Sequence, residues 1–416
     1  MSDIMKIIDS FKGRCACGMC HDTAVRDVRI GSGLVNSVGD ILRDNGFPKR
    51  LLLVADKNTL KAAEGIEKSL RGFEVEYKIY SSLRVAEIRH VCELERLIEN
   101  REIAVLSVGT GSVNDPCRLA AARQNKPLCI FATAPSMDGF ASYSSPLVDN
   151  GFKASYPAKS PEIIIGDTAI LAGAPAYLKS AGFGDMIAKY VGLIDWQVSS
   201  LLTDELYCPR VAALTRSAVD MLMENADKVT VNDEETAGKI FEALLTTGIA
   251  MSFMKNSRPA SGSEHIIAHL IECLQLKDGI TPNYHGEDVG VCTLEMLKFY
   301  NELAARTEIE AQPDNPCWDK IYSVYGDMAQ EVKRLNTPNP ADKIEPQLLE
   351  RKWRKICAAV KAVPSYNEAR AAMQKAGCKI TVQDIGKSRE LFETCVEYSP
   401  YMRNRITLLR IKNMIK

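Results

Sequence analysis

Residues 102–115 read EIAVLSVGTGSVND, an apolar run that ends in a glycine turn. The aliphatic run Ile103 to Val108 predicts a buried strand. The turn Gly109 to Asp115 precedes a plausible helix, so backbone amides there can approach a pyrophosphate at the helix N-terminus. The third glycine of the GxGxxG fingerprint is missing, and the turn also fits an ordinary strand-to-helix loop. The stretch therefore predicts an α/β unit and leaves its ligand open.

The sequence on either side repeats this alternation of strands and helices. Further strands are predicted at Arg50 to Ala55, Phe73 to Tyr80, Leu128 to Thr133 and Glu162 to Gly166. Helical runs separate them, at residues 86–100 and 114–124 for example. This is the pattern of βαβ units around a mostly parallel sheet. We therefore expect an open α/β nucleotide-binding domain over residues 1–174.

The strand signal fades beyond about residue 169, and long helical periodicity replaces it. In residues 234–254 the apolar side chains fall at spacings typical of one buried helix face. We expect an all-α C-terminal domain over residues 175–416.

The composition limits the partners that the protein can have. The 416 residues are 46% hydrophobic and 25% charged, and 52 basic side chains balance 53 acidic ones to a net charge of −1. This balance offers no polybasic field to nucleic acid or an anionic membrane. The N-terminal residues do not read as a signal peptide, and the strongly apolar stretches are short. We expect a cytoplasmic protein with no nucleic acid partner and no membrane insertion.

Polar residues follow several predicted strands. Asp56 ends the strand that starts at Arg50, where its carboxylate can accept hydrogen bonds from ribose hydroxyls or simply cap the next helix. Thr133 to Ser136 close another strand. Ligands of open α/β sheets bind at the carboxyl ends of strands, so these residues are predicted to line one crevice.

Three of the five histidines lie within 21 residues of each other in the helical half. Ser261 to Glu264 reads as a capping box that starts a helix, so His265 and His269 would project from one face. His285 lies in a turn before the next helix. Two converging imidazoles suit Zn²⁺ or a similar ion, and Asp185, which follows Gly182 and Gly184, offers a third ligand. The alternative to a metal site is a purely structural role. The histidines would then be hydrogen-bonded polar residues at helix ends, and Asp185 would cap its helix.

The thirteen cysteines are mostly scattered singly, which is typical of reduced core thiols. The exception is the run Cys15-Ala16-Cys17-Gly18-Met19-Cys20-His21. It has the ligands to bind zinc or to respond to oxidation, but no second cysteine pair lies near it in the sequence.

Six motifs, in this order, resemble the sn-glycerol-1-phosphate dehydrogenases, including the bacterial type: GTGSVND, TAPSMDGFAS, GFKASYPAK, GFGDMIAKY, SGSEHIIAH and HGEDVGV. The resemblance spans roughly residues 28–300 and is weaker beyond. It extends to the superfamily of iron-type alcohol dehydrogenases, glycerol dehydrogenases and dehydroquinate synthases, and implies a dehydroquinate synthase-like fold.

The resemblance implies a function and assigns residues to it. The reaction would be reversible reduction of dihydroxyacetone phosphate, a phosphorylated triol precursor, with NADH or NADPH. One divalent metal would bind to Asp185, His265 and His285. Asp138, Asp185 and His269 would face the substrate as catalytic residues, with His269 as the candidate proton donor. The implied cofactor contacts are Asp56, Gly111, Ser112, Val113, Asn114, Asp115, Thr133, Ala134, Pro135, Ser136 and Ser142.

Some features depart from the superfamily or leave choices open. Some iron-type enzymes have a histidine four residues after the metal aspartate, where this chain has Lys189, so Zn²⁺ or Ni²⁺ is favoured over iron. Lys159 and Arg258 are candidates to hold the substrate phosphate. A glycerol dehydrogenase, a dehydroquinate synthase-like cyclase and a non-catalytic NAD-binding protein are the alternatives. A homodimer and a role in phospholipid metabolism are expected only by analogy.

Overall fold

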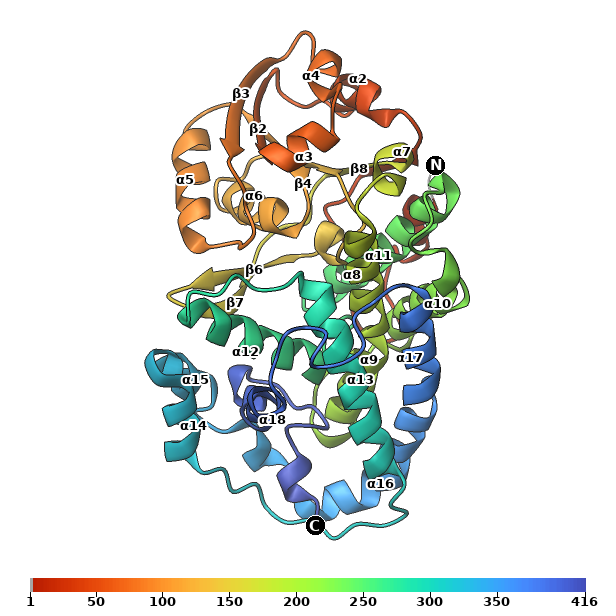
Figure 1. Ribbon diagram of the computed structural model, residues 1–416, viewed down its shortest axis with the longest axis vertical. Coiled ribbons are helices and arrows are strands. Elements are labelled where there is room, and N and C mark those ends of the chain that lie inside the picture. The colour runs from red at the N-terminus through yellow and green to blue at the C-terminus, as the bar shows by residue number, and fades with distance from the viewer. Residues whose placement is uncertain (1–2) are drawn as a thin grey trace.

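A computed structural model describes residues 3–416 (Figure 1). Its main sheet has six parallel strands in the order β1-β8-β5-β4-β2-β3. The strands are β1 (Asp27–Gly31), β2 (Arg50–Asp56), β3 (Glu74–Tyr80), β4 (Ala104–Gly109), β5 (Leu128–Ala132) and β8 (Ile163–Asp167). The five predicted strands are confirmed to within one residue at each end. The predicted α/β fold class is confirmed with them.

The sheet is buried on both faces. In β2, Leu52 and Val54 join one apolar cluster, while Leu51 and Leu53 join another on the opposite side. Side chains of a strand alternate between faces, so a strand covered by helices on both sides must be apolar at every position. This explains why the strands read as continuous apolar runs.

Helices and short turns connect and cover these strands. They are α1 (Asp3–Ser10), η1 (Leu34–Ser37), α2 (Val38–Asp44), α3 (Lys57–Ala62), α4 (Ile66–Ser69), α5 (Ile88–Ile98), α6 (Gly111–Arg123), η2 (Gly139–Ala141) and α7 (Thr168–Ala172).

The strand order reverses next to β2. The chain passes from β2 to β3 on one side, then returns to place β4 on the other side of β2. Ligands of open α/β sheets bind outside the carboxyl ends of the strands at such a reversal. The carboxyl ends of β2 and β4 are Asp56 and Gly109, so the topology brings two of the predicted ligand-binding segments to one crevice.

An antiparallel hairpin lies between the sheet and the helical region (Figure 1), and the sequence analysis did not predict it. It consists of β6 (Ser144–Asp149) and β7 (Phe152–Pro157). Asn150 and Gly151 connect the strands with φ angles of 48° and 78°. A two-residue Asn-Gly loop with positive φ at both positions matches the right-handed twist of the strands. This dipeptide was therefore a readable hairpin signal.

The chain beyond the sheet is helical, as predicted. Its α-helices are α8 (Ala176–Ile187), α9 (Lys189–Leu202), α10 (Pro209–Glu224), α11 (Glu234–Met254), α12 (Ser263–Lys277), α13 (His285–Ala304), α14 (Trp318–Tyr325), α15 (Ala329–Leu335), α16 (Pro346–Lys361), α17 (Tyr366–Lys375) and α18 (Arg389–Tyr398). Short 3₁₀ turns are η3 (Ala226–Lys228), η4 (Gly326–Met328), η5 (Pro340–Lys343), η6 (Ser399–Met402) and η7 (Lys412–Met414). One large apolar cluster joins most of these helices.

The N-terminal residues cross from the sheet to the helical region. Phe11 stacks on Phe253 of α11 at 4.7 Å between ring centroids, and Arg210 of α10 donates to the Ser10 carbonyl at 2.6 Å. The segment before β1 is thus attached to helices far along the chain. The domain division at residues 174 and 175 stays a prediction.

Among the described residues, no helix combines the length and the apolar character needed to cross a bilayer.

Candidate active site

The three residues predicted as metal ligands lie together in the structure. Asp185 is in α8, His265 is in the first turn of α12, and His285 is the first residue of α13. One ligand atom from each lies within 4.8 Å of the others. The Oδ1 atom of Asp185 is 3.3 Å from Nε2 of His265, and the rings of His265 and His285 are 5.3 Å apart between centroids. An aspartate oxygen and two imidazole nitrogens form a donor set that suits a divalent metal.

Glycines allow the helices that carry these ligands to approach closely. A Cβ atom on Gly286 would lie 1.8 Å from the Ala181 carbonyl oxygen of α8, and one on Gly184 would lie 2.3 Å from the Gly286 carbonyl oxygen. The backbones of α8 and α13 are therefore in direct contact at the crossing. On another side of α8, a Cβ on Gly182 would lie 2.0 Å from the Pro135 carbonyl oxygen. The two glycines that precede Asp185, Gly182 and Gly184, thus bring it close to both His285 and the loop after β5.

A Gly286→Ala variant tests this crossing. The added methyl group cannot fit beside the Ala181 carbonyl unless the helices separate, and overpacking of this kind costs ~1–3 kcal/mol or more. We expect the free energy of unfolding, measured in urea, to fall by at least ~2 kcal/mol. Gly31→Ala is the control, because a Cβ there meets only Leu34 at 3.9 Å. Equal stability of the two variants would contradict the close crossing.

Neighbouring groups orient the candidate ligands. Nδ1 of His265 lies 2.6 Å from Oε1 of Glu264, which fixes the Nδ1–H tautomer and leaves Nε2 facing Asp185. The backbone N–H of Asp138 donates to Oδ2 of Asp185 at 2.9 Å, leaving Oδ1 on the side of the histidines. Metal-binding histidines commonly have a carboxylate partner of this kind. The residues present therefore fit a divalent metal.

Lys189 is a charged residue next to the candidate ligands. The sequence analysis noted it only because some iron-type enzymes have a histidine at this position, and assigned it no role. Its side chain is fully buried, with Nζ 3.0 Å from Asp185 Oδ1 and 2.7 Å from Asp138 Oδ2. Burial alone would raise the pKa of Asp185, but the positive charge of Lys189 lowers it. Asp185 is therefore ionised, as a metal ligand must be. The spacing of Asp185 and Lys189 by one helical turn was the signal for this pair.

His269 lies beside the candidate ligands and contacts a residue from the end of the chain. Its ring stacks on His285 at 5.3 Å between centroids, and Nη2 of Arg403 lies 3.2 Å from its Nδ1 atom. Arginine only donates, so Nδ1 accepts and the proton of the neutral ring is on Nε2. Burial, with the positive charges of Lys153 and Arg403, lowers the pKa of His269 well below its ordinary value, so the ring is neutral.

The carboxyl end of β2 carries Asp56, for which two roles were left open. Its Oδ1 atom accepts hydrogen bonds from the backbone of Asn58 and Thr59, at 2.8 and 2.9 Å, as the N-cap of α3. Its Oδ2 atom accepts from the backbone of Leu83 at 3.3 Å. The capping role is thus present in the structure. A contact with ribose stays a prediction.

The glycine turn after β4 starts helix α6 at Gly111. The first N–H groups of a helix have no partner within it, so those of Gly111 and Ser112 are available to an anion. The side chains that follow support the turn: Ser107 donates to Asn114 at 2.6 Å, and Asp115 pairs with Arg118 at 2.5 Å. If a nucleotide binds at this turn, we therefore expect backbone N–H groups rather than side chains to contact it.

The remaining predicted cofactor residues lie after β5, next to α8. Thr133, Ser136 and Ser142 are buried, and Ser142 Oγ accepts from the backbone of Ser144 at 3.1 Å. The loop they form contacts α8 through Pro135 and continues to Asp138, whose N–H binds Asp185. One continuous loop therefore connects the nucleotide edge of the sheet to the candidate metal site.

The two residues proposed to hold a phosphate are engaged elsewhere, and that prediction is wrong. Lys159 is on the surface and pairs with Glu162 at 2.8 Å. Arg258 is buried in contacts with Glu205, Ser199 and the Ile406 carbonyl.

Arg403 and Lys153 are the cations beside the histidines, and no local sequence pattern links either to them. Arg403 is 134 residues from His269, too far along the chain for any local pattern to connect them.

Comparison with known proteins agrees with the fold. The model of the family described as iron-containing alcohol dehydrogenase matches residues 29–175. A solved archaeal alcohol dehydrogenase from a Red Sea brine pool has a TM-score of 0.62 at 13% identity, covering 92% of each chain. A solved 1,3-propanediol oxidoreductase has a TM-score of 0.62 at 16% identity, covering 93% of this chain and 94% of its own. These likenesses define the class: a protein with the fold of the iron-type alcohol dehydrogenases.

Two sequence relatives narrow the class. Glycerol-1-phosphate dehydrogenase (NAD(P)+) of Halalkalibacterium halodurans is 28% identical over 99% of this chain and 98% of its own. The enzyme of the same name from Methanosarcina mazei is 34% identical over 65% of this chain and 76% of its own. The chain belongs to the glycerol-1-phosphate dehydrogenase family.

Proposed function

We propose that this protein is an NAD(P)-dependent sn-glycerol-1-phosphate dehydrogenase, which reversibly reduces dihydroxyacetone phosphate to sn-glycerol 1-phosphate. Membership of the family supports this assignment, and relatives from a bacterium and an archaeon carry the same name. The arrangement of Asp185, His265 and His285 next to the carboxyl edge of a parallel sheet supports it independently, with the first two residues buried and the third half-buried.

The position of Arg403 is the observation that favours a phosphorylated substrate. Its guanidinium is half-buried beside His269, and no carboxylate of residues 3–416 lies within ion-pair distance of it. It donates to the carbonyls of Met402 and Lys153. A half-buried cation without a counter-ion is incompletely solvated, and a phosphate dianion offers the missing charge and a matching pair of acceptors. Lys153, whose charge also acts on His269, lies nearby but is already paired with Glu272 at 2.5 Å.

A divalent metal would be held by Asp185, His265 and His285 and would supply Lewis acidity. The residues after β2, β4 and β5 would hold the nicotinamide cofactor, which would supply the hydride.

The protein's own residues orient and charge the site. Glu264 holds the His265 ring, the N–H of Asp138 holds Asp185, and Lys189 balances the two aspartates. His269 presents its Nε2–H on the side away from Arg403, where it can donate a hydrogen bond to the substrate oxygen while that oxygen takes its proton from water. The contact of Asp138 with Lys189 keeps its carboxylate next to Asp185.

The finer assignments extend this proposal. The ligands fit Zn²⁺ or Ni²⁺, and the relatives' names leave NAD and NADP both open. A homodimer, a cytoplasmic location and a role in phospholipid metabolism stay predictions.

A steady-state assay tests the function. Purified protein loaded with Zn²⁺ or Ni²⁺ is supplied with NADH or NADPH and either dihydroxyacetone phosphate or dihydroxyacetone. We expect net NAD(P)H consumption, with kcat/KM at least ~10²-fold higher for the phosphorylated substrate, since a charged hydrogen-bonded contact contributes about 3 kcal/mol. Preference for dihydroxyacetone would indicate a glycerol dehydrogenase instead. Turnover of a cyclase substrate without net cofactor consumption would indicate a dehydroquinate synthase-like enzyme.

A further inference from the structure

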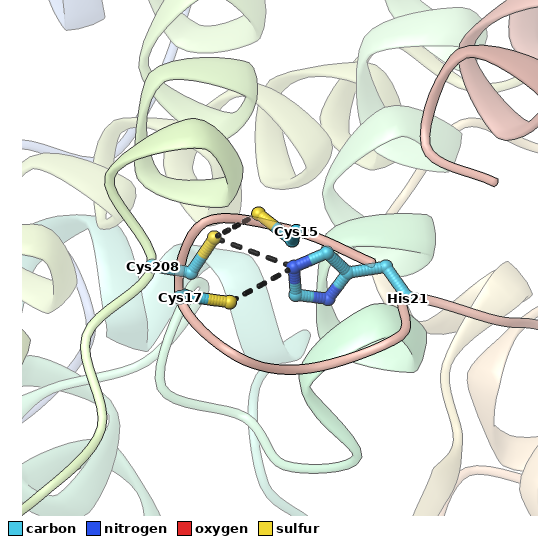
Figure 2. A group of neighbouring side chains, drawn as sticks. All are labelled: Cys15, Cys17, His21 and Cys208. Carbon is cyan, nitrogen blue, oxygen red and sulfur yellow. Dashed lines mark hydrogen bonds between the residues drawn. The ribbon is translucent and has the colours of Figure 1, made fainter. Parts of the chain in front are cut away.

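A second group of potential metal ligands lies outside the active site. Cys15, Cys17 and His21 belong to the loop between α1 and β1, and Cys208 is the N-cap residue of α10 (Figure 2). One ligand atom from each of the four lies within 4.8 Å of the others. Cys208 is the fourth ligand that the N-terminal sequence lacks, and only the fold brings it there.

We propose that these four residues form a structural Zn²⁺ site that joins the N-terminal loop to the helical region.

The distances between the ligand atoms match a tetrahedral zinc. The sulfurs of Cys15 and Cys208 are 3.8 Å apart, and Nε2 of His21 is 3.4 Å from the sulfurs of both Cys17 and Cys208. With Zn–S bonds of about 2.3 Å and a Zn–N bond of about 2.0 Å, tetrahedral geometry places sulfurs about 3.8 Å apart and sulfur and nitrogen about 3.5 Å apart. Three cysteines and one histidine form a closed set with no position left for a substrate, as in structural sites.

The far side of the His21 ring provides independent support. Its Nδ1 atom lies 3.3 Å from the carbonyl oxygen of Phe253, which only accepts. The ring proton is therefore on Nδ1, and the lone pair of Nε2 is directed at the sulfurs, as Figure 2 shows. A backbone carbonyl in this position is the usual outer partner of a metal-binding histidine. Phe11 and Phe253 pack around the ring, with centroids 5.7 and 5.8 Å from its own, and shield it from water.

The loop backbone is arranged to present the sulfurs. The N–H of Gly18 donates to the Cys15 carbonyl at 2.9 Å, and Gly18 adopts a φ of 91°, which favours glycine.

The first test is metal analysis of the full-length protein, purified from zinc-containing medium under reducing conditions. A His265→Ala variant, which lacks one ligand of the active site, is expected to retain one zinc per chain. Metal-free protein titrated with Co²⁺ is expected to show thiolate-to-cobalt charge-transfer absorption in the near ultraviolet, which the aspartate and histidines of the active site cannot produce. Absence of either the zinc or this absorption from otherwise folded protein would overturn the proposal.

Two cysteine variants localise the site. In the His265→Ala background, Cys208→Ser is expected to lose the zinc and most of the cobalt absorption, and to lower the melting temperature. Cys20→Ser is the matched control, because Cys20 is an exposed cysteine of the same loop that lies outside the cluster. Equal effects of the two substitutions would refute the assignment. If Cys208→Ser does not fold, Cys17→Ser replaces it with the same expected losses. A Cys15–Cys208 disulfide in the isolated protein, with no zinc bound, would also overturn the proposal.

Discussion

Replacing His265 with alanine is expected to remove the active-site metal and to lower kcat/KM for dihydroxyacetone phosphate by at least ~10³-fold. Lewis acid catalysis contributes several kcal/mol, and each 1.4 kcal/mol corresponds to a factor of ten in rate. His265 supplies one of only two imidazoles in the ligand set, and its loss also leaves the carboxylate of Glu264 without its ring partner. The measurements are steady-state kinetics and metal content per chain, counted separately from the zinc proposed at Cys208.

Two further variants show whether the effect of His265→Ala comes from loss of a metal ligand. His90→Gln is the control, since His90 is a buried histidine of α5 that is not one of the candidate ligands, and it should leave activity and metal content unchanged. Glu264→Gln keeps the shape of the side chain but weakens its hold on His265, and should lower metal affinity by ~10–100-fold. Full metal content and activity in the His265→Ala protein would contradict the ligand assignment.

Replacing Arg403 with methionine is expected to raise the KM for dihydroxyacetone phosphate by ~10²-fold or more. Turnover of dihydroxyacetone is expected to change much less, and only through the lost contact with Nδ1 of His269. The reason is that Arg403 is a half-buried guanidinium without a carboxylate partner among the described residues, so its charge is free to meet the phosphate. Loss of a desolvated charge contact costs ~2–5 kcal/mol. Methionine fills a similar volume without the charge, and Arg403→Lys should recover part of the affinity.

Lys159→Met is the control for the charge of the substrate. Lys159 is exposed and paired with Glu162, so removing it should not change either KM. A change in the folded state would alter kinetics with both substrates, whereas a lost phosphate contact affects only one. If Arg403→Met left the KM for dihydroxyacetone phosphate unchanged, the phosphate assignment would be wrong, and the metal site would stand independently.

The accuracy of the strand predictions has a simple physical cause. Strands such as β2 are buried on both faces, so each position must be apolar and the run is visible in the sequence. The hairpin β6–β7 was missed because its burial is uneven, even though its Asn150-Gly151 turn is a strong local signal.

Helix starts show how tertiary contacts replace local ones. Ser261 to Glu264 predicted a capping box, and a helix does begin there. Its Ser263 N–H, however, donates to Asp195 of α9 at 2.7 Å, while Ser261 bonds back to Ser257. A carboxylate from a neighbouring helix has taken the role of the local hydroxyl. The pattern therefore located the helix correctly but identified the wrong cap.

By itself, the sequence determined the α/β and helical halves, the carboxyl-end loops, and the set Asp185, His265 and His285, because apolar periodicity and motif order are local properties of the chain. Only the tertiary structure decided which residues from distant parts of the chain lie beside the histidines. Arg403 reaches His269, and Cys208 reaches His21 across 187 residues. Such contacts depend on how the helices pack. The backbones of α8 and α13, for example, touch at Gly184 and Gly286. Helix packing requires no fixed spacing between the contacting residues in the sequence, so a sequence pattern cannot reveal it.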